Sequence, residues 1–238
     1  MKKLLILFAL ILSVLLSAAA NAEDGIIPAE VAAGDIISFG NYEQDNDHTN
    51  GPEPIVWIVL DVVDEKALLL SKYGLDSKPY HDYSGIITWE DCTLRYWLNN
   101  FFLNEAFNTD EQTAIVITEV DNSANQGYSG WRKINENNTQ DRIFLLSFAE
   151  ADKYLGIGKS KKTRVAPTDY AIQNGAWTSS VNQTADHKRA GWWWLRSPAD
   201  SLSYAAGVDD YGLLYYSDTH LDDGVVRPAL WLDLNSDN

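Results

Sequence analysis

Cysteine is nearly absent from this sequence, since Cys92 is the only one among 238 residues. A disulfide within the chain is therefore excluded, and so is a metal or redox site that needs two thiolates. A nucleophilic thiol requires a neighbouring base, and the residues next to Cys92 provide none. We expect an inert thiol that is buried or half-buried, and a fold stabilised by its core, to which nine Trp, twelve Tyr and seven Phe contribute large side chains.

Positive charge is also scarce, with 18 Lys and Arg against 34 Asp and Glu and a net charge of -16. A nucleic-acid partner requires clustered basic residues that release counterions from the phosphates. The dense basic stretch at 159–164 is the only one of its kind, and its pattern is typical of a solvated loop. We therefore expect no nucleic-acid partner.

Long apolar runs are confined to the beginning of the chain. Lys2 and Lys3 precede an apolar run over 4–16, and Ala20-Asn21-Ala22 supplies the small-x-small pattern that signal peptidase accepts. We expect residues 1–22 to be a cleaved signal peptide, with an uncleaved anchor as the alternative, and residues 23–238 to form a single domain. Cleavage would leave 16 basic against 34 acidic residues, a net charge of -18. The expected location is secreted, periplasmic or at the cell surface, with no membrane insertion after cleavage.

Sequence signatures of catalysis are missing as well. The histidines His48, His81, His187 and His220 do not form the spacing of a helical zinc site, and no nucleophile elbow, phosphate loop or dinucleotide fingerprint occurs. The adjacent carboxylates Asp209-Asp210 and Asp222-Asp223 leave open a secreted hydrolase of the glycosidase type, which needs only two carboxylates. Adjacent carboxylates in so acidic a chain are more often solvated turn residues, so we expect no catalytic residues.

The sequence does contain a series of short elements with clear boundaries. Apolar patterns in the first half predict strands at 35–39, 54–63 and 67–71, of which the last two form a hairpin. The second of these is apolar on both faces, as in a buried strand. Polar caps predict helices that begin at Thr88, Thr109, Ser147 and Thr168. Gly156 and the pair Asn174-Gly175 should end the last two of these helices.

The remaining apolar runs read as strands. Between the helices they predict strands at 114–120 and 143–146, separated by a polar surface excursion at 121–140. After Gly191 they predict strands at 192–196, 204–208, 213–216 and 224–234, with a hairpin turn at 209–212. Because the strands gather at both ends of a helical middle, the order favours an α+β fold over a parallel sheet.

Several motifs occur in a fixed order along the chain. They are Ile-Ser-Phe-Gly-Asn-Tyr at 37–42, Pro-Ile-Val-Trp at 54–57, Leu-Arg-Tyr-Trp-Leu-Asn at 94–99, Trp-Trp-Leu-Arg-Ser-Pro at 193–198 and Gly-Val-Val-Arg-Pro-Ala-Leu at 224–230. The chain resembles a bacterial domain-of-unknown-function family, often exported, that carries these motifs. Its C-terminal pattern is similar to C-type-lectin-like domains of the formylglycine-generating-enzyme type.

The resemblance implies a single C-type-lectin-like domain with short twisted antiparallel sheets, two or more helices and long loops. Formylglycine-generating enzymes use catalytic cysteines and copper, and the lone Cys92 excludes that chemistry here. The motif residues have a structural interpretation, because strand alternation places at least half of the run Trp192-Trp193-Trp194 in the core. We expect Trp57, Trp97 and Trp193 to pack there, and Arg196 and Arg227 to be cations satisfied by buried carboxylates or carbonyls.

Calcium is a possible ligand because lectin-like domains often hold it with clustered oxygen atoms. The candidates are Asp45, Asp47 and Glu53, with Asn46 and Asn50 in the same loop, and the group Asp218, Asp222 and Asp223. Neither group has the spacing of a known calcium motif, so the expectation is no metal and no cofactor, with calcium kept as an option.

The segment 199–223 is the predicted ligand-binding face. It contains Ser201, Ser203 and Ser217 and the expected binding residues Tyr204, Asp209, Asp210, Tyr211, Tyr215, Tyr216, Asp218 and His220. Tyrosine contributes contact area at low entropic cost, and small polar residues adapt to a ligand. The leading hypothesis is an exported, non-catalytic module that binds a glycan or a protein through this face. The alternatives are the hydrolase and a structural cell-surface protein.

Overall fold

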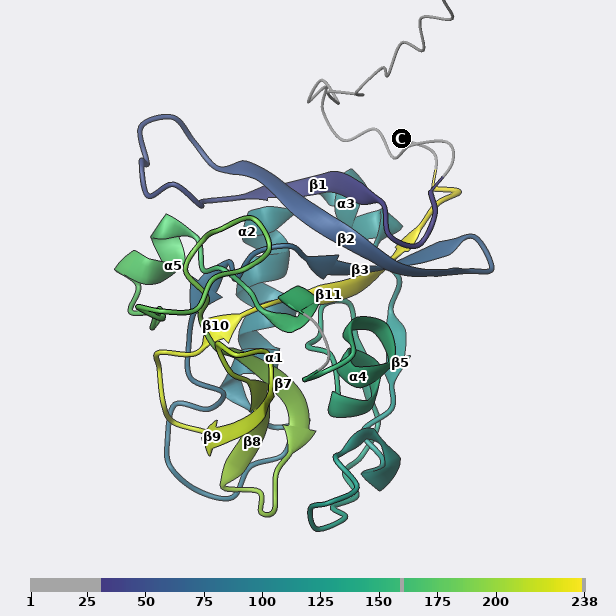
Figure 1. Cartoon of the computed structure of the whole chain (residues 1–238). Coiled ribbons are helices and arrows are strands. Elements are labelled where there is room, and N and C mark those ends of the chain that lie inside the picture. Colours follow the sequence, from purple (N-terminus) through teal and green to yellow (C-terminus); the bar gives the residue numbers. More distant parts are fainter. Residues whose placement is uncertain (1–30, 159–160, 237–238) are drawn as a thin grey trace, which may run out of the picture.

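The computed structural model describes residues 31–158 and 161–236, and the expected signal peptide lies outside this part of the chain. The first sheet has the order β1 (Ile36–Tyr42), β2 (Glu53–Val63), β3 (Lys66–Ser71) and β11 (Ala229–Asp233). The second has the order β4 (Asp76–Ser77), β10 (Val225–Val226), β7 (Trp193–Pro198), β8 (Tyr204–Val208) and β9 (Leu214–Asp218). The two curled sheets form separate layers (Figure 1), and helices lie beside them, so the α+β prediction is confirmed.

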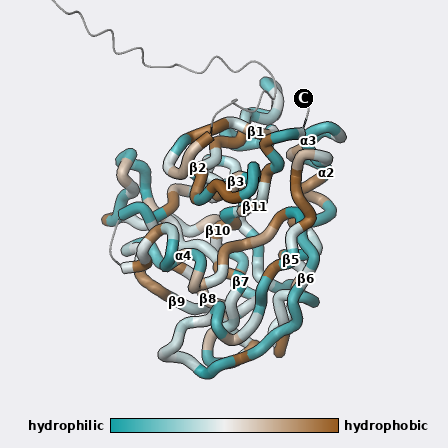
Figure 2. The backbone as a smooth tube through the Cα atoms, turned by 90° about the vertical axis from the view of Figure 1, so that its right-hand side faces the viewer, coloured by the Kyte–Doolittle hydropathy of each residue, from teal (hydrophilic) through white to brown (hydrophobic). Residues whose placement is uncertain are grey.

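The β2–β3 hairpin forms where the sequence predicted it. Asp64 and Glu65 have φ values of 48° and 61°, which turn the chain between the paired residues Val63 and Lys66. The expectation that β2 is buried on both faces is wrong, because Ile55, Trp57 and Val59 are buried while Val56, Ile58 and Leu60 are only half-buried. Hydrophobic residues are concentrated along this sheet (Figure 2), and one core cluster joins it to the second sheet.

The first long helix begins five residues after the predicted cap. It consists of α1 (Thr93–Trp97), a π-helical turn η1 (Leu98–Phe102) and α2 (Leu103–Ala106). The Thr88 hydroxyl donates to Asp91 over 3.2 Å, whereas the Sγ of Cys92 accepts the backbone N–H of Arg95 over 3.4 Å and caps the helix. The Thr88 side chain therefore pairs with the Asp91 side chain and does not cap the helix as predicted.

The next helix, α3 (Thr109–Ala114), is displaced by one residue from its predicted start. Asn108 is the cap, and its side chain and that of Glu111 form a reciprocal capping box. Thr109 is thus the first helical residue, and the side chain of Gln112 instead donates to the carbonyl of Phe107 over 2.9 Å.

Two predicted strands are largely wrong. In the run 114–120 only β5 (Thr118–Val120) is a strand, and it pairs with β6 (Thr139–Asp141). The run 143–146 contains no regular strand and has one isolated bridge, between Phe144 and Ala229. All four of its residues are buried in the core cluster, so side-chain packing explains an apolar run that the pattern assigned to strand pairing.

The last two predicted helices are confirmed. Ser147 and Glu150 form a capping box at the start of α4 (Phe148–Leu155), and Gly156 ends it at φ 69°. Thr168 caps α5 (Asp169–Gln173), which is followed by Gly175 at φ 109°. Among the described residues no helix is long and apolar enough to cross a membrane.

The C-terminal strands lie close to their predicted positions, with one important difference. The strand β8 has its predicted bounds, β7 and β9 begin one residue late, and Gly212 closes the hairpin turn at φ 83°. The predicted strand 224–234 is two strands, because β10 pairs with β7 whereas β11 pairs with β3 in the other sheet. Arg227 and Pro228 make the crossing between the sheets, which is drawn in yellow in Figure 1.

Candidate functional site

Five aromatic side chains form a continuous strip, which we call the aromatic strip: the exposed Tyr128, Tyr204, Tyr215 and Tyr216 and the half-buried Trp131. Tyr204 on β8 and Tyr216 on β9 lie on one face of the sheet, because Tyr204 pairs with Asp218 and Tyr216 pairs with Ala206. Their ring centroids are 5.6 Å apart, and Tyr215 stacks on Tyr216 with centroids 6.2 Å apart. The edge of the second sheet therefore gathers three of the predicted tyrosines.

The other two members come from the loop at 121–138, which the sequence suggested was only a surface excursion. Trp131 meets Tyr216 edge to face with centroids 5.6 Å apart, and Tyr128 contacts Trp131 at 5.5 Å and Phe148 at 5.2 Å. The backbone N–H of Arg132 donates to Asp200 over 2.9 Å and ties the loop to the β7–β8 connection. Aromatic residues in an otherwise polar loop were the signal that could have identified this extension.

The strip presents its rings to solvent despite these mutual contacts. Tyr128, Tyr204, Tyr215 and Tyr216 keep 41%, 37%, 42% and 48% of their surface exposed, so ring area remains for a ligand. Tyr215 rests on the buried Trp192, with ring centroids 5.8 Å apart. Within the described chain, the hydroxyls of the exposed Tyr204, Tyr215 and Tyr216 form no hydrogen bond to another residue.

The remaining predicted binding residues lie apart from the strip or make structural contacts. Asp209 accepts the backbone N–H groups of Tyr211 and Leu213 over 3.0 and 2.8 Å, and Asp210 accepts from Asn182 over 2.7 Å. Tyr211 is exposed at the hairpin tip, where its carbonyl accepts from Arg164. Further residues of the predicted face are the half-buried Asp218, Ser201 and Ser203, the buried Ser217 and the exposed His220.

The motif residues pack largely as expected. Trp57 and Trp193 are fully buried, and Trp97 is half-buried beneath Lys78, whose Nζ lies 4.6 Å from its ring centroid. Trp192 and Trp194 are also buried, so the Trp-rich run offers no exposed indole face to a sugar. Arg196 and Arg227 are each 1% exposed.

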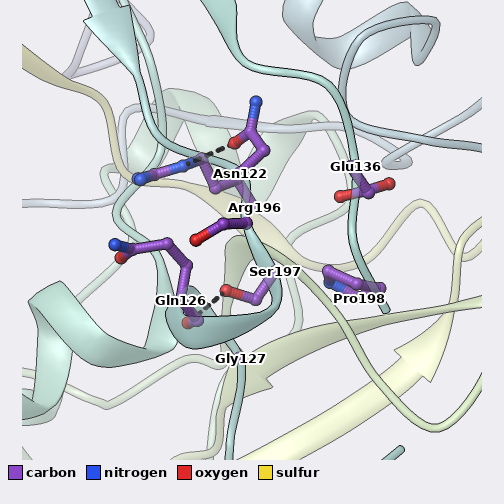
Figure 3. Close-up of a pocket in the computed structure, with 8 residues that line it drawn as sticks. Asn122, Gln126, Gly127, Glu136, Arg196, Ser197 and Pro198 are labelled. Atoms are coloured by element: carbon purple, nitrogen blue, oxygen red, sulfur yellow. Dashed lines mark hydrogen bonds between the residues drawn. The ribbon is translucent and has the colours of Figure 1, made fainter. Parts of the chain in front are cut away.

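Arg196 lines a small polar cavity, where Figure 3 shows its hydrogen bond to Asn122, and a complete set of acceptors holds its guanidinium. Its Nε donates to Asn122 over 3.0 Å, its two terminal nitrogens form a bidentate pair with Glu150, and they also donate to the carbonyls of Leu145 and Asp121. All five N–H groups of the guanidinium are thus satisfied. The cavity volume is about 10 Å³, enough for one water molecule and too small for a ligand.

Two buried acids beside this network have shifted pKa values. Burial raises the pKa of Glu136 to about 7, against the smaller opposing effects of the Trp89 backbone N–H and of Arg196. Burial also raises the pKa of the Cys92 thiol to about 12, so this thiol is neutral and inert at physiological pH. Sequence patterns gave no sign of the Glu136 environment, because it depends on packing between distant segments.

One group of carboxylates has an arrangement that suits a hard cation. Oxygen atoms of Glu43, Asp45 and Glu53 lie within 4.8 Å of one another, and the Oε1 of the buried Glu43 has no hydrogen-bond partner in the described chain. The sequence predicted Asp47 in this group, but the third member is Glu43. The Asp47 carboxylate instead accepts a hydrogen bond from the Thr49 hydroxyl. The second predicted group, Asp218, Asp222 and Asp223, is not brought together in the described residues. Calcium fits the first group best, since it binds carboxylate oxygens in flexible loops.

The second carboxylate pair, Asp222 and Asp223, has one exposed and one half-buried member. Asp222 is exposed, and its carbonyl accepts from the hydroxyl of Ser77 over 2.7 Å. Burial, aided by the charge of Asp222, raises the pKa of Asp223, whose Oδ1 is buried without a partner in the described chain.

The comparisons with known proteins identify a family. The chain belongs to the family defined by a domain of unknown function (DUF6273), which matches residues 64–234. No curated protein and no solved structure shows a significant match to the chain. The strip, Arg196 and Arg227 all lie inside the matched segment, whereas the carboxylate group at 43–53 precedes it.

Proposed function

We propose that this member of the family is an exported, non-catalytic protein whose C-type-lectin-like domain binds a glycan through the aromatic strip. The observation that carries the proposal is the row of partly exposed rings formed by Tyr128, Trp131, Tyr204, Tyr215 and Tyr216. The expected signal peptide supports export, and the acidic surface favours a neutral ligand over an anionic polymer.

The chemistry of the strip suits a sugar chain. A pyranose ring presents an apolar face of C–H groups, which packs on an aromatic ring, and hydroxyls, which pair with phenol groups at the rim. Tyr204 and Tyr216 meet at an interplanar angle of 82°, so they offer surfaces in two directions. Tyrosine loses little rotamer entropy on binding, and the contacts among these rings hold them before the ligand arrives.

The carboxylates support binding over hydrolysis. A glycosidase needs an acid and a second carboxylate that face one cleft. Asp209 and Asp210 instead accept hydrogen bonds that fix the hairpin turn and its neighbour Asn182.

Glycan-array binding by the purified mature protein tests the proposal. Tyr216→Ala should weaken capture about thirty-fold, which corresponds to the ~2 kcal/mol typical of a central aromatic contact. Tyr216→Phe should retain most binding, because the ring remains. Tyr96→Ala is the matched control, since Tyr96 is 60% exposed on α1 and its ring contacts Phe101 outside the strip.

Two outcomes would reject the proposal. Unchanged capture by the folded triple variant of Tyr204, Tyr215 and Tyr216 to Ala would remove the strip as the binding face. Binding to protein arrays and to no glycan would show that the ligand is a protein and not a glycan. Export is tested separately, because the N-terminus of the protein recovered outside the cytoplasm should begin at Glu23.

A further inference from the structure

Arg227 is a buried cation without a carboxylate partner in the described chain. It is 1% exposed, its Nε donates to the carbonyl of Ser71 over 2.9 Å, and its guanidinium lies 4.8 Å from the ring centroid of Trp193. Its Nη1 is buried and has no hydrogen-bond partner among the described residues. Burial lowers its pKa to about 9, which reflects the cost of holding an uncompensated charge away from water.

The other buried arginine shows what a compensated guanidinium looks like in the same core. Arg196 forms a bidentate pair with Glu150, and each of its remaining N–H groups donates to a protein oxygen. The sequence predicted the same environment for both residues, and Arg227 departs from it. A buried donor in a folded protein is normally satisfied, so the unsatisfied Nη1 of this guanidinium indicates a partner from outside the chain.

Arg227 lines a cavity that is large enough to hold such a partner. The cavity has a volume of about 440 Å³ and lies where β2, the chain after β3, the end of α4 and the segments 161–166 and 184–186 meet. This volume is within the range of small-molecule sites, and the open face of the cavity gives the ligand an entry route.

The charge of the cavity is opposite to that of the whole chain. Of the seventeen described lining residues, five are Lys or Arg and only Asp186 is acidic, although the net charge is -16. Lys161, Lys162 and Arg164 come from the basic stretch that the sequence suggested was a solvated loop. Residues 161–164 are tied to the core there, because the indole N–H of Trp193 donates to the carbonyl of Thr163 over 2.9 Å.

The cavity also has an apolar wall. The half-buried Ile58 and Leu60 project from the face of β2 that the sequence had assigned to the core, and Tyr73 and Tyr154 line the same space. An inorganic ion would leave this wall unused, whereas an organic body would bury it. The wall therefore favours an organic anion.

We propose that this cavity binds a small organic carboxylate, whose carboxylate group accepts from Arg227 and whose body packs against Ile58 and Leu60. A planar carboxylate matches the planar guanidinium. The rim cations are partly engaged, since Lys72 pairs with Asp186 at 3.5 Å and Arg164 donates to the carbonyls of Tyr211 and Gln183. The site therefore offers one buried guanidinium, that of Arg227, and rim cations that already have protein partners. Such a site matches the single charge of a carboxylate better than the two charges of a phosphate dianion.

Calorimetric titration of the mature protein tests the proposal with three carboxylates and their neutral counterparts: acetate and acetamide, benzoate and benzamide, glucuronate and glucose. At least one carboxylate should bind, and its neutral counterpart should bind at least about thirty-fold more weakly, as expected for loss of a buried charge pair. Arg227→Met, which keeps the side-chain volume and removes the charge, should bind the carboxylate more weakly by the same factor.

Variants at the rim keep the test decisive if Arg227→Met does not fold. Lys161→Glu reverses an exposed charge that lines the cavity and should weaken carboxylate binding several-fold, more at low salt. Lys133→Glu makes the same charge change on the loop at 121–138 and should have no effect. Variants of the aromatic strip should also leave carboxylate binding unchanged, so this site and the proposed glycan site can fail independently.

Three results would overturn the inference. The first is equal binding of each acid and its neutral counterpart. The second is an equal loss of carboxylate binding in Lys161→Glu and Lys133→Glu. The third is saturable binding of inorganic phosphate with no binding of any of the three carboxylates.

Discussion

Replacing Arg196 by methionine would measure how much the acceptors around a buried guanidinium stabilise this fold. The substitution keeps most of the side-chain volume and removes the hydrogen bonds to Glu150, Asn122 and the carbonyls of Leu145 and Asp121. The Glu150 side chain is 29% exposed and still accepts the backbone N–H of Ser147, so it keeps part of its stabilisation.

The expected cost follows from these contacts. Breaking a buried ion pair by removing one partner destabilises a protein by about 3–5 kcal/mol, and the partial exposure of Glu150 favours the lower end. We expect a loss of about 3 kcal/mol, or roughly 6–12 °C in Tm for a domain of this size. Urea unfolding followed by tryptophan fluorescence should show a lower midpoint with an unchanged slope.

Arg227→Met provides the comparison within the same core. In a buffer without organic anions this variant should cost about 1 kcal/mol or less, because removal of an uncompensated charge offsets the lost hydrogen bond to Ser71. Equal costs for the two substitutions, or a larger cost at Arg227, would refute the distinction between a saturated and an unsaturated arginine.

Three further outcomes are expected. Because the folded pKa of Glu136, about 7, lies above its ordinary value of 4.5, wild type should lose up to about 3 kcal/mol of stability relative to Glu136→Gln as the pH rises from 4.5 to 7. Parallel pH profiles of the two unfolding free energies would contradict this. Cys92 should resist alkylation in the native protein and react only on unfolding, since burial raises its pKa to about 12; rapid native labelling would show an accessible thiolate. Calcium at about 100 times its Kd should stabilise the protein by about 2.7 kcal/mol through Glu43, Asp45 and Glu53, measured as a Tm increase. Glu43→Gln should remove the increase, and an equal response in that variant would place calcium elsewhere.

Local signals in the sequence predicted several elements whose determinants lie within a few residues, although they misplaced the helix starts expected at Thr88 and Thr109. The β2–β3 hairpin, the Ser147–Glu150 capping box and the turn at Gly212 each depend on neighbouring residues, and each appears as expected. Elements that depend on distant contacts were missed. The run at 143–146 is buried by packing and not by strand pairing, and the last apolar run divides because its two halves find partners in different sheets.

The candidate sites show the same division. The tyrosine-rich composition of 199–223 was enough to predict exposed tyrosines at Tyr204, Tyr215 and Tyr216. Trp131 joins them only because a loop more than seventy residues earlier folds back over β9. The cavity at Arg227 was not predictable, since a sequence pattern does not distinguish an arginine with a carboxylate partner from one without.

The crossing at Arg227 and Pro228 links the two sheets through a very short segment. Two residues separate β10 from β11, so neither sheet can detach without pulling a strand out of the other. Heat should therefore melt both layers in one transition, with equal calorimetric and van't Hoff enthalpies. A molecule bound at this junction would raise the melting temperature of the entire domain, although it touches only one corner.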